Sequence, residues 1–401
     1  MKTVVVLGGN QMACPAIERL QQRGFRVVAV DANANAPARG VADQFVHQNF
    51  SDVAGTSAAL ADIAFVGIIP LSDFAIRAAA GIARERNLPG WNEFAELCFT
   101  SKVAMKRCWL DNGLPTPRCA FSTVAQLAAG HFPKWDSWPA VVKPSFSGGG
   151  SRGVFVARNW DEVQAGVNEV EKTYLDGDVV IEEFVRGTEH TLEVLISRGT
   201  PTLLSISDKE NYPGSDTVVQ RLHFPGSIGH SHRAALERLV FAACAAMRLT
   251  DGTTHFEVLI SEDGPCLLEV GGRPGGGLNF HPICEISTGY DYPGLLAAVL
   301  TGDVPDFARK PSEHLVWHYF PRGEGVLQAI DGFKGIKDEP DVVDAELYEQ
   351  VGKARLDLRN DLARPGYVLV RSKSAAQARE RAARLVESVK FVTADAGDDT
   401  P

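Results

Sequence analysis

The stretch that decides the fold reads HFEV at residues 255–258 and LLEVGGRPGGG at residues 267–277. A polar turn at 261–264 separates these apolar pieces, which predicts a β-hairpin with Glu257 and Glu269 on its two strands. Two facing carboxylates in a partly buried sheet are costly unless a cation lies between them. Oxygen ligands suit Mg²⁺ bound jointly with substrate phosphates, so the pair predicts a magnesium site that Mn²⁺ could also occupy. A surface hairpin with Arg–Glu pairing is the alternative.

Arg273 comes just after the second strand, so its guanidinium would aim a positive charge at an anion in the same cavity. Gly276 and Gly277 belong to a glycine run that would let a substrate approach the backbone closely. His281 is near enough in sequence to line that pocket, although a structural or surface histidine fits the pattern equally well. These residues form the predicted substrate-binding side of the site.

A glycine-rich loop at residues 145–152 separates two predicted strands, 140–143 and 154–157. Its bare backbone N–H groups could hold phosphate oxygens, and Lys143 at the end of the preceding strand would sit beside them. No G-K-[ST] ends the loop, so it is not a Walker A loop, and a flexible hairpin loop remains the alternative. The predicted phosphate-binding residues of the loop are Ser147, Gly148, Gly149 and Gly150.

The segment VIEEFVRGTEH at residues 180–190 reads as a strand, a short connector and another strand. Such a connector between two lobes can offer backbone groups to an adenine edge, and its acidic side chains can accept from the exocyclic amine or from ribose hydroxyls. An ordinary acidic hairpin explains the same residues. Taken alone, the segment leaves both interpretations open.

The N-terminal residues predict a doubly wound α/β domain. A strand at 3–7, the pair Gly8-Gly9, a helix and a strand at 26–30 follow one another, and Asp31 ends the second strand. The dinucleotide fingerprint G-x-G-x-x-G is missing, which favours a tight turn over an NAD site.

The remaining patterns predict an alternation of strands and helices. A helix is expected over 94–112, where Lys102 lies, and further helices at 160–174, 231–247 and 374–390. Further strands are expected at 65–71, 179–183, 189–197, 202–208, 254–260, 266–270 and 368–371.

The composition is that of an ordinary globular protein. The chain has 401 residues, of which 45% are hydrophobic and 22% charged, and 40 basic against 50 acidic residues give a net charge of −10. This charge argues against a general nucleic-acid partner, and no apolar stretch is long enough to predict a membrane span. The 7 cysteines lack C-x-x-C spacing and suggest reduced thiols, so a cytoplasmic location is expected.

Taken in order, these motifs make the chain resemble an ATP-grasp ligase. The ordered set consists of Lys102, the strand VVKP with Lys143, the glycine-rich loop, IEEFV-x-G-x-E, the paired glutamates and Arg273. The stretch EVGGRPGGG and the later GVLQAIDG and RPGYVLV look most like the bacterial L-amino-acid ligases, which join amino acids into dipeptides.

The resemblance implies a role for each of these positions. Lys102 and Lys143 would hold ATP phosphates beneath the glycine-rich loop, and Glu257 and Glu269 would bind Mg²⁺. Arg273 would steady the acyl phosphate and the tetrahedral species. The residues implied to bind adenine and ribose are Glu182, Glu183, Val185 and Glu189.

Two positions depart from the resemblance. Many relatives have Asp before the first lysine, where this chain has Ser101. Many have Asn two residues after the second metal glutamate, where this chain has Gly271, so the number of Mg²⁺ ions stays open.

The resemblance also implies an ATP-grasp architecture of α/β and α+β parts. A pre-ATP-grasp domain is expected at 1–93, a small lobe at 94–178, a large lobe with the metal site at 179–312, a C-terminal α+β domain at 313–395 and a disordered tail at 396–401. The expected reaction is ADP-forming ligation of a small-molecule carboxylate to an amine, and a homodimer is possible. The alternatives are a purine-pathway-like ligase or carboxylase, an NAD-dependent oxidoreductase and a non-catalytic nucleotide sensor.

Overall fold

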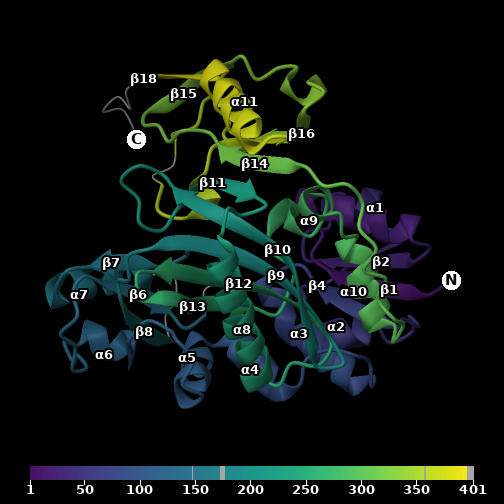
Figure 1. Cartoon of the computed structure of the whole chain (residues 1–401), viewed down its shortest axis with the longest axis horizontal. Coiled ribbons are helices and arrows are strands. Elements are labelled where there is room, and N and C mark those ends of the chain that lie inside the picture. Colours follow the sequence, from purple (N-terminus) through teal and green to yellow (C-terminus); the bar gives the residue numbers. More distant parts are fainter. Residues whose placement is uncertain (147, 172–176, 356–357, 395–401) are drawn as a thin grey trace.

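The computed structural model describes the whole chain except residues 147, 172–176, 356–357 and 395–401 (Figure 1). The predicted tail at 396–401 therefore lies outside the described residues. Among the described residues, no helix is long and apolar enough to cross a membrane.

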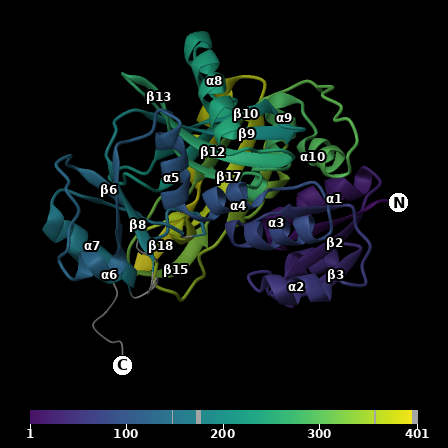
Figure 2. The ribbon, with the colours of Figure 1, turned by 90° about the horizontal axis from the view of Figure 1, so that it is seen from below.

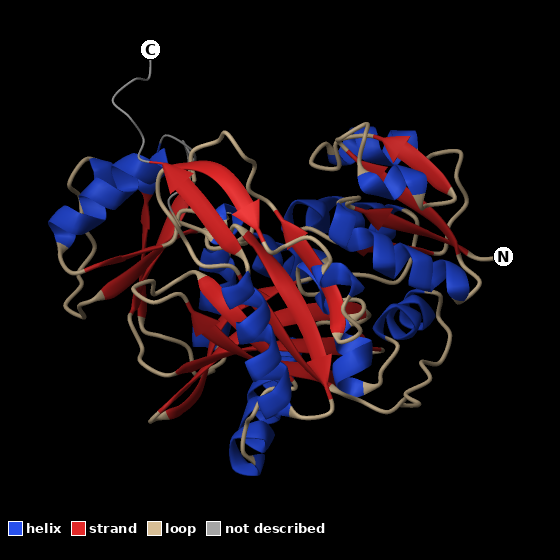
Figure 3. Cartoon of the chain, turned by 90° about the horizontal axis from the view of Figure 1, so that it is seen from above, coloured by secondary structure: helices blue, strands red, loops and turns tan. Residues whose placement is uncertain are grey.

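The N-terminal domain contains a four-stranded parallel sheet in the order β3-β2-β1-β4, as the strand–glycine turn–helix pattern predicts. Figure 3 shows this domain set to one side of the central sheets. The Gly9 amide donates to the Asp31 carboxylate across 2.7 Å, and a Cβ on Gly9 would lie 3.0 Å from Ala38. This close packing agrees with the tight-turn interpretation. The domain comprises β1 Thr3–Leu7, α1 Cys14–Gln22, β2 Arg26–Asp31, β3 Gln44–His47, α2 Val53–Ala59, β4 Gly67–Pro70 and α3 Ile76–Glu85.

The single helix expected over 94–112 is wrong, because the structure breaks it into α4 (Glu93–Thr100) and α5 (Lys102–Asp111). Ser101 lies between them with extended backbone angles, φ −145° and ψ 109°, and its hydroxyl accepts from the Ala104 amide at 3.2 Å. Serine is a favoured N-cap, so its side chain starts a new helix. Lys102 therefore becomes the first residue of α5.

The small lobe is a four-stranded antiparallel sheet in the order β5-β8-β6-β7. The predicted boundary at 178/179 assigned β8 to the large lobe, whereas β8 pairs with both β5 and β6. A division drawn from sheet membership therefore runs after Glu183. The lobe comprises β5 Cys119–Thr123, α6 Val124–Ala128, β6 Ala140–Pro144, β7 Phe155–Ala157, α7 Trp160–Glu171 and β8 Asp178–Glu183.

The large sheet has eight strands in the order β13-β12-β9-β10-β11-β14-β17-β16. Its last three strands belong to the predicted C-terminal domain, so that part of the chain extends the sheet of the large lobe. The strands are β9 Thr188–Ser197, β10 Thr200–Asn211, β11 Val219–Phe224, β12 Gly252–Ser261, β13 Gly264–Gly271, β14 His314–Tyr319, β16 Val342–Leu347 and β17 Gly366–Ser372.

Helices cover this sheet, and a further pair of strands lies at the C-terminal end. Side chains of α4, α5 and α8 pack in one cluster with those of β9, β12 and β13. The view from below shows the ribbons of these helices beside the strands (Figure 2). This packing fixes α5 beside the sheet and so places Lys102 and Lys106 near β13. The remaining elements are α8 His230–Ala246, α9 Ile283–Thr288, α10 Tyr292–Leu300, β15 Val326–Asp331, α11 Ala375–Ser388 and β18 Lys390–Ala394.

Candidate active site

A cavity of about 510 Å³ lies between the small sheet and the large sheet. Strands β6, β10, β12 and β13 line it together with the glycine-rich loop and the connector between β8 and β9. Most of the residues singled out in the sequence meet here: Lys143, Gly149, Gly150, Glu182, Glu183, Val185, Glu189, Glu257, Glu269 and Arg273.

Glu257 and Glu269 lie directly opposite each other in the β12–β13 ladder, as the hairpin pattern predicted. Both side chains are 34% exposed, and each has a lysine partner. Lys102 Nζ lies 2.8 Å from Glu269 Oε1, and Lys209 Nζ lies 3.2 Å from Glu257 Oε2. Lys209 also contacts the Glu189 carboxylate, so it links two of the predicted ligand residues.

These contacts set the charge state of the site. Burial opposes ionisation of Glu257, but Lys209 and His255 hold the pKa of its carboxyl well below the ordinary range. Burial also favours the neutral amine of Lys209, yet Glu189 and Glu257 raise the pKa of Lys209 far above its usual value. Glu257 and Lys209 therefore both stay ionised. An ionised carboxylate is what the binding of a cation would require of Glu257.

No sequence motif pointed to Lys209, which lies near the end of β10. The alternation of side chains along β10 does not show which residues of other strands Lys209 contacts.

Among the described residues, no group of three or more His, Cys, Asp or Glu side chains could by itself hold a metal ion. The facing pair Glu257 and Glu269 thus provides a partial ligand set, made of oxygen atoms only. Mg²⁺ is commonly bound in this way, by one or two carboxylates with phosphate and water oxygens completing its octahedron. The donor set fits Mg²⁺ shared with a phosphate ligand.

Arg273 is held by an acidic residue from the N-terminal domain. Its Nε and Nη2 donate to Asp73 Oδ1 and Oδ2 at 2.9 and 2.6 Å, and its Nη1 donates to the Pro274 carbonyl at 2.9 Å. Burial alone would raise the pKa of Asp73, but Arg273 lowers it below the ordinary range. Asp73 lines the cavity too, and no sequence motif pointed to it, because 200 residues separate the two partners.

The glycine-rich loop lies at the junction of three parts of the chain. A Cβ on Gly148 would fall 2.2 Å from the Phe74 ring, and a Cβ on Gly149 would fall 2.6 Å from Asp73. The Gly150 carbonyl accepts from the Asp361 amide of the C-terminal domain at 3.2 Å. Gly148, Gly149 and Gly150 all have positive φ, between 68° and 77°, so glycine is needed here. Ser147 lies outside the described residues.

The connector that was predicted to meet adenine begins at a buried carboxylate. Glu182 Oε2 accepts from Lys143 Nζ at 2.8 Å, and Glu182 Oε1 faces a second ammonium group, that of Lys106. Both oxygens of Glu182 thus have a lysine partner. Glu183 Oε1 accepts from the Arg118 amide at 2.8 Å, so this oxygen already has a donor.

Lys106 is a second lysine on Glu182 that the sequence analysis did not single out. Its Nζ lies 3.1 Å from Glu182 Oε1, and its side chain is fully buried. Burial lowers the pKa of Lys106 while Glu182 raises it, and the two lysines together hold the pKa of Glu182 below its ordinary range against the effect of burial.

The buried carboxylate of Glu193 holds the glycine run that follows Arg273. Glu193 Oε2 accepts from the Gly275 amide at 3.0 Å and from the Tyr292 hydroxyl at 3.0 Å. Glu193 Oε1 lies 2.6 Å from His255 Nδ1. Gly276 and Gly277 are not among the cavity-lining residues, and a Cβ on Gly277 would fall 2.4 Å from the Trp317 ring.

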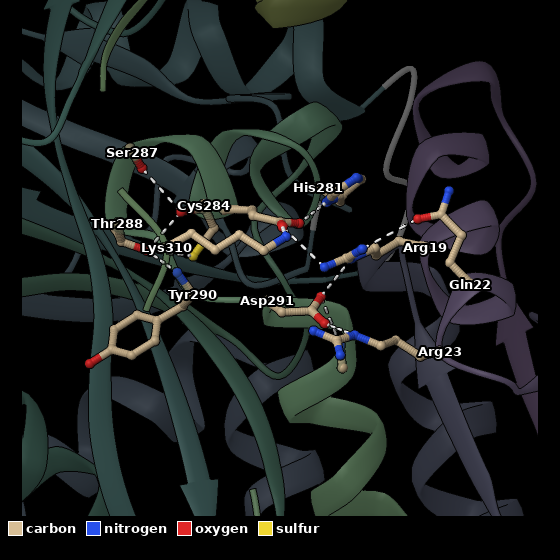
Figure 4. Close-up of polar contacts among 12 residues, drawn as sticks. Arg19, Gln22, Arg23, His281, Cys284, Ser287, Thr288, Tyr290, Asp291 and Lys310 are labelled. Carbon is tan, nitrogen blue, oxygen red and sulfur yellow. Dashed lines mark hydrogen bonds and ion pairs between the residues drawn. The ribbon is translucent and has the colours of Figure 1, made fainter. Parts of the chain in front are cut away.

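The structure places His281 in a different polar cluster, between α1 and α9 (Figure 4). Its Nδ1 lies 3.4 Å from Glu285, which also pairs with Arg19 at 3.0 Å. Arg19 reaches Asp291 at 3.0 Å as well, so the cluster ties the N-terminal domain to α9 and α10. Burial lowers the pKa of His281, which favours a neutral ring. The geometry thus supports the structural interpretation of His281.

Three models of known protein families match successive parts of the chain. A ribonucleotide synthetase preATP-grasp domain matches residues 1–89, an ATP-grasp domain matches 136–281, and the L-amino acid ligase C-terminal domain 2 matches 318–394. The matches follow the order of the three parts seen in the structure.

Individual proteins support the same assignment. An uncharacterised protein of Sinorhizobium fredii is 27% identical over 325 residues, which cover 77% of this chain and 64% of that protein. A D-alanine–D-alanine ligase of Delftia acidovorans is 28% identical over 230 residues, covering 53% of this chain and 67% of that protein. The crystal structure of an L-amino acid ligase from Bacillus licheniformis superposes with a TM-score of 0.82 at 23% identity, covering 98% of this chain and 99% of that one. The chain therefore carries a preATP-grasp domain, an ATP-grasp domain and an L-amino acid ligase C-terminal domain.

Proposed function

We propose that the chain is an ADP-forming carboxylate–amine ligase that joins an amino acid to another amino acid or small amine. The observation that carries the proposal is the cavity in which Lys143, the facing pair Glu257 and Glu269, and Arg273 line one space. The C-terminal match to the L-amino acid ligases favours amino acids as substrates.

In this proposal ATP lies between the two sheets. Glu182 and Glu183 would lie beside the adenine, and backbone groups of the connector near Val185 would meet its edge. Glu189 would accept from the ribose hydroxyls, and Lys102 and Lys143 would approach the phosphates. The amides of the glycine-rich loop would cover them.

Glu257 and Glu269 would hold Mg²⁺, which would neutralise charge on the phosphates. Lys102 pairs with Glu269 and Lys209 with Glu257, and Lys209 lines the same cavity. The side chains around the phosphates thus combine two anions for the metal with several fixed cations, an inventory typical of phosphoryl transfer.

The reaction would proceed in two balanced steps. The substrate carboxylate attacks the γ-phosphorus of ATP, so that an acyl phosphate forms and the bond to ADP breaks. The amine then attacks the acyl carbon, the C–O bond to phosphate breaks, and the nitrogen loses its proton as the amide forms. Arg273, fixed by Asp73, would donate its remaining N–H groups to the oxyanion of the tetrahedral species.

The test is a screen for phosphate release with ATP, Mg²⁺ and pairwise mixtures of amino acids, followed by mass analysis of the products. We expect ADP, phosphate and an amide in equal amounts with at least one mixture. A chain that binds MgADP but releases no phosphate with any acid and amine would instead be a nucleotide sensor, which would refute the proposal. Light scattering at micromolar concentration tests the accompanying proposal of a homodimer.

A second candidate is a ligase or carboxylase acting on another small metabolite. It is favoured by the N-terminal match, whose model describes the preATP-grasp domain of ribonucleotide synthetases. The same screen with amino-ribonucleotides or bicarbonate in place of the amino acids would distinguish the two.

A further inference from the structure

Lys106 is a fully buried cation to which the proposed reaction gives no role. It lies on α5 four residues after Lys102, so both side chains leave the same face of the helix. Lys102 reaches Glu269 of the large sheet, whereas Lys106 reaches Glu182 of the small sheet. Burying an ammonium is costly unless its charge and its donors all find partners.

The donors of Lys106 are all engaged. Its Nζ donates to Thr116 Oγ1 at 2.8 Å and to the Leu267 carbonyl at 3.3 Å, and it forms the ion pair with Glu182 at 3.1 Å. The ammonium also lies 5.3 Å from the centre of the Trp109 ring. Leu267 belongs to β13 and Glu182 to β8, so this one cation joins the two sheets that enclose the cavity.

The charges around Glu182 add up to an excess of one positive charge. The Glu182 side chain is 2% exposed and lies between two ammonium groups, Lys106 at 3.1 Å and Lys143 at 2.8 Å. Without Lys106, Glu182 and Lys143 would form a closed neutral pair. With Lys106, the group keeps a net charge of +1, and Lys143 carries it to the cavity wall.

We propose that Lys106 is a positioning residue that shares the charge of Glu182, and thereby keeps the ammonium of Lys143 available for the phosphates of a bound nucleotide. The inference rests on the proposed function, because it takes a nucleotide to be the ligand of this cavity. It assigns to Lys106 an effect on phosphate binding through Lys143, without any contact between Lys106 and the ligand.

The first test compares the full-length chain with its Lys106→Met variant in calorimetric binding of MgADP and of adenosine. Loss of one charge near a polyanion at intermediate dielectric should weaken MgADP binding about tenfold. Adenosine has no phosphate, so its affinity should stay within about twofold of the parent value. Arg107→Met is the matched control, since Arg107 is the exposed neighbour on α5, and it should leave both affinities unchanged.

The second test asks whether the effect passes through Glu182. In the Glu182→Gln background there is no carboxylate charge to share, so removing Lys106 should change MgADP affinity far less than in the parent. This comparison also serves if Lys106→Met alone does not fold, because the double variant removes Lys106 together with its buried partner and leaves only Lys143, which lines the cavity, without a carboxylate.

Two results would overturn the inference. One is an equal loss of MgADP affinity on removing Lys106 in both backgrounds, and the other is an equal loss of adenosine and MgADP affinity, which a general distortion of the cavity would give. Failure of the parent chain to bind MgADP would overturn the proposed function and the inference together. Nucleotide binding without any ligation would overturn only the proposed function, because the inference is measured by binding.

Discussion

Replacing Arg273 by lysine separates its role in the reaction from its role in the structure. The guanidinium has five N–H donors, of which two go to Asp73 and one to the Pro274 carbonyl. Two donors therefore remain for an oxyanion. The lysine ammonium keeps the charge, but it cannot make the two parallel hydrogen bonds to Asp73 while also reaching the substrate.

The expected losses of stability and of turnover follow from this count of N–H donors. Losing one of two hydrogen bonds to a charged partner should cost about 1.5–3 kcal/mol of stability. Losing the donors to the oxyanion should lower turnover about a hundredfold or more, since those interactions strengthen only in the transition state. Binding of ATP should change little, because Lys102, Lys143 and the glycine-rich loop are intact.

The assay combines steady-state phosphate release, calorimetric MgADP binding and urea unfolding. Asp73→Asn is the matched control, because it leaves Arg273 in place but removes its buried counter-charge. We expect it to cost more stability than Arg273→Lys, about 3–5 kcal/mol, and less of the rate. If Arg273→Lys weakens ATP binding and leaves turnover unchanged, Arg273 is a ground-state phosphate clamp and this reasoning is wrong.

Three further predictions follow from single side chains. Glu269→Gln keeps the size of a half-exposed side chain but removes a charge beside the metal, so phosphate release should fall by about a hundredfold or more while the melting temperature stays close to that of the parent; near-normal release would exclude Glu269 as a ligand. Tryptic cleavage after Arg152 should slow when ATP is added, because phosphates would fix the glycine-rich loop, and equal cutting rates would argue against a lid. Burial, with Arg221 and His223, lowers the pKa of His318 to about 3. The unfolded chain therefore binds a proton that the folded chain does not as the pH falls from about 6.5 to about 3, and stability should decline over that range. His318→Gln should flatten this decline in urea unfolding at pH 7 and pH 4.5, and an unchanged difference would disprove the assignment.

The sequence predicts the parts of the site that lie within one hairpin or one loop. The turn at 261–264 predicts the hairpin that carries Glu257 and Glu269, because it is a local pattern, whereas their exact pairing also needs a shift of register between Glu257 and Val258 that no pattern indicates. The connector between β8 and β9 and the strands beside the glycine-rich loop are predictable for the same reason. Each depends on residues fewer than about 15 positions apart, where periodicity and turn residues carry the information.

The site residues that no sequence pattern singled out are those whose partners are remote in the chain. Asp73 lies 200 residues before Arg273, Lys209 reaches Glu257 from another strand, and Lys106 meets Glu182 across the two sheets. A single acidic or basic residue in a strand or turn is most often solvated, so the sequence gives no reason to select it. Only the packing of the domains shows that these charges are buried and paired.

The two departures from the family pattern have physical explanations that only the structure shows. At position 101, serine caps α5 through its hydroxyl, a task that aspartate performs equally well at a helix N-terminus, and the Lys102 amide is tied to the Ser145 carbonyl at 2.8 Å. The start of α5 is thus fixed to the glycine-rich loop whichever residue provides the cap. At position 271, a Cβ would already lie 3.2 Å from Asp73 Oδ1, so a longer side chain would press on the carboxylate that holds Arg273. Glycine at position 271 therefore accommodates the Asp73–Arg273 pair, because Asp73 of the N-terminal domain occupies the space that a side chain there would need.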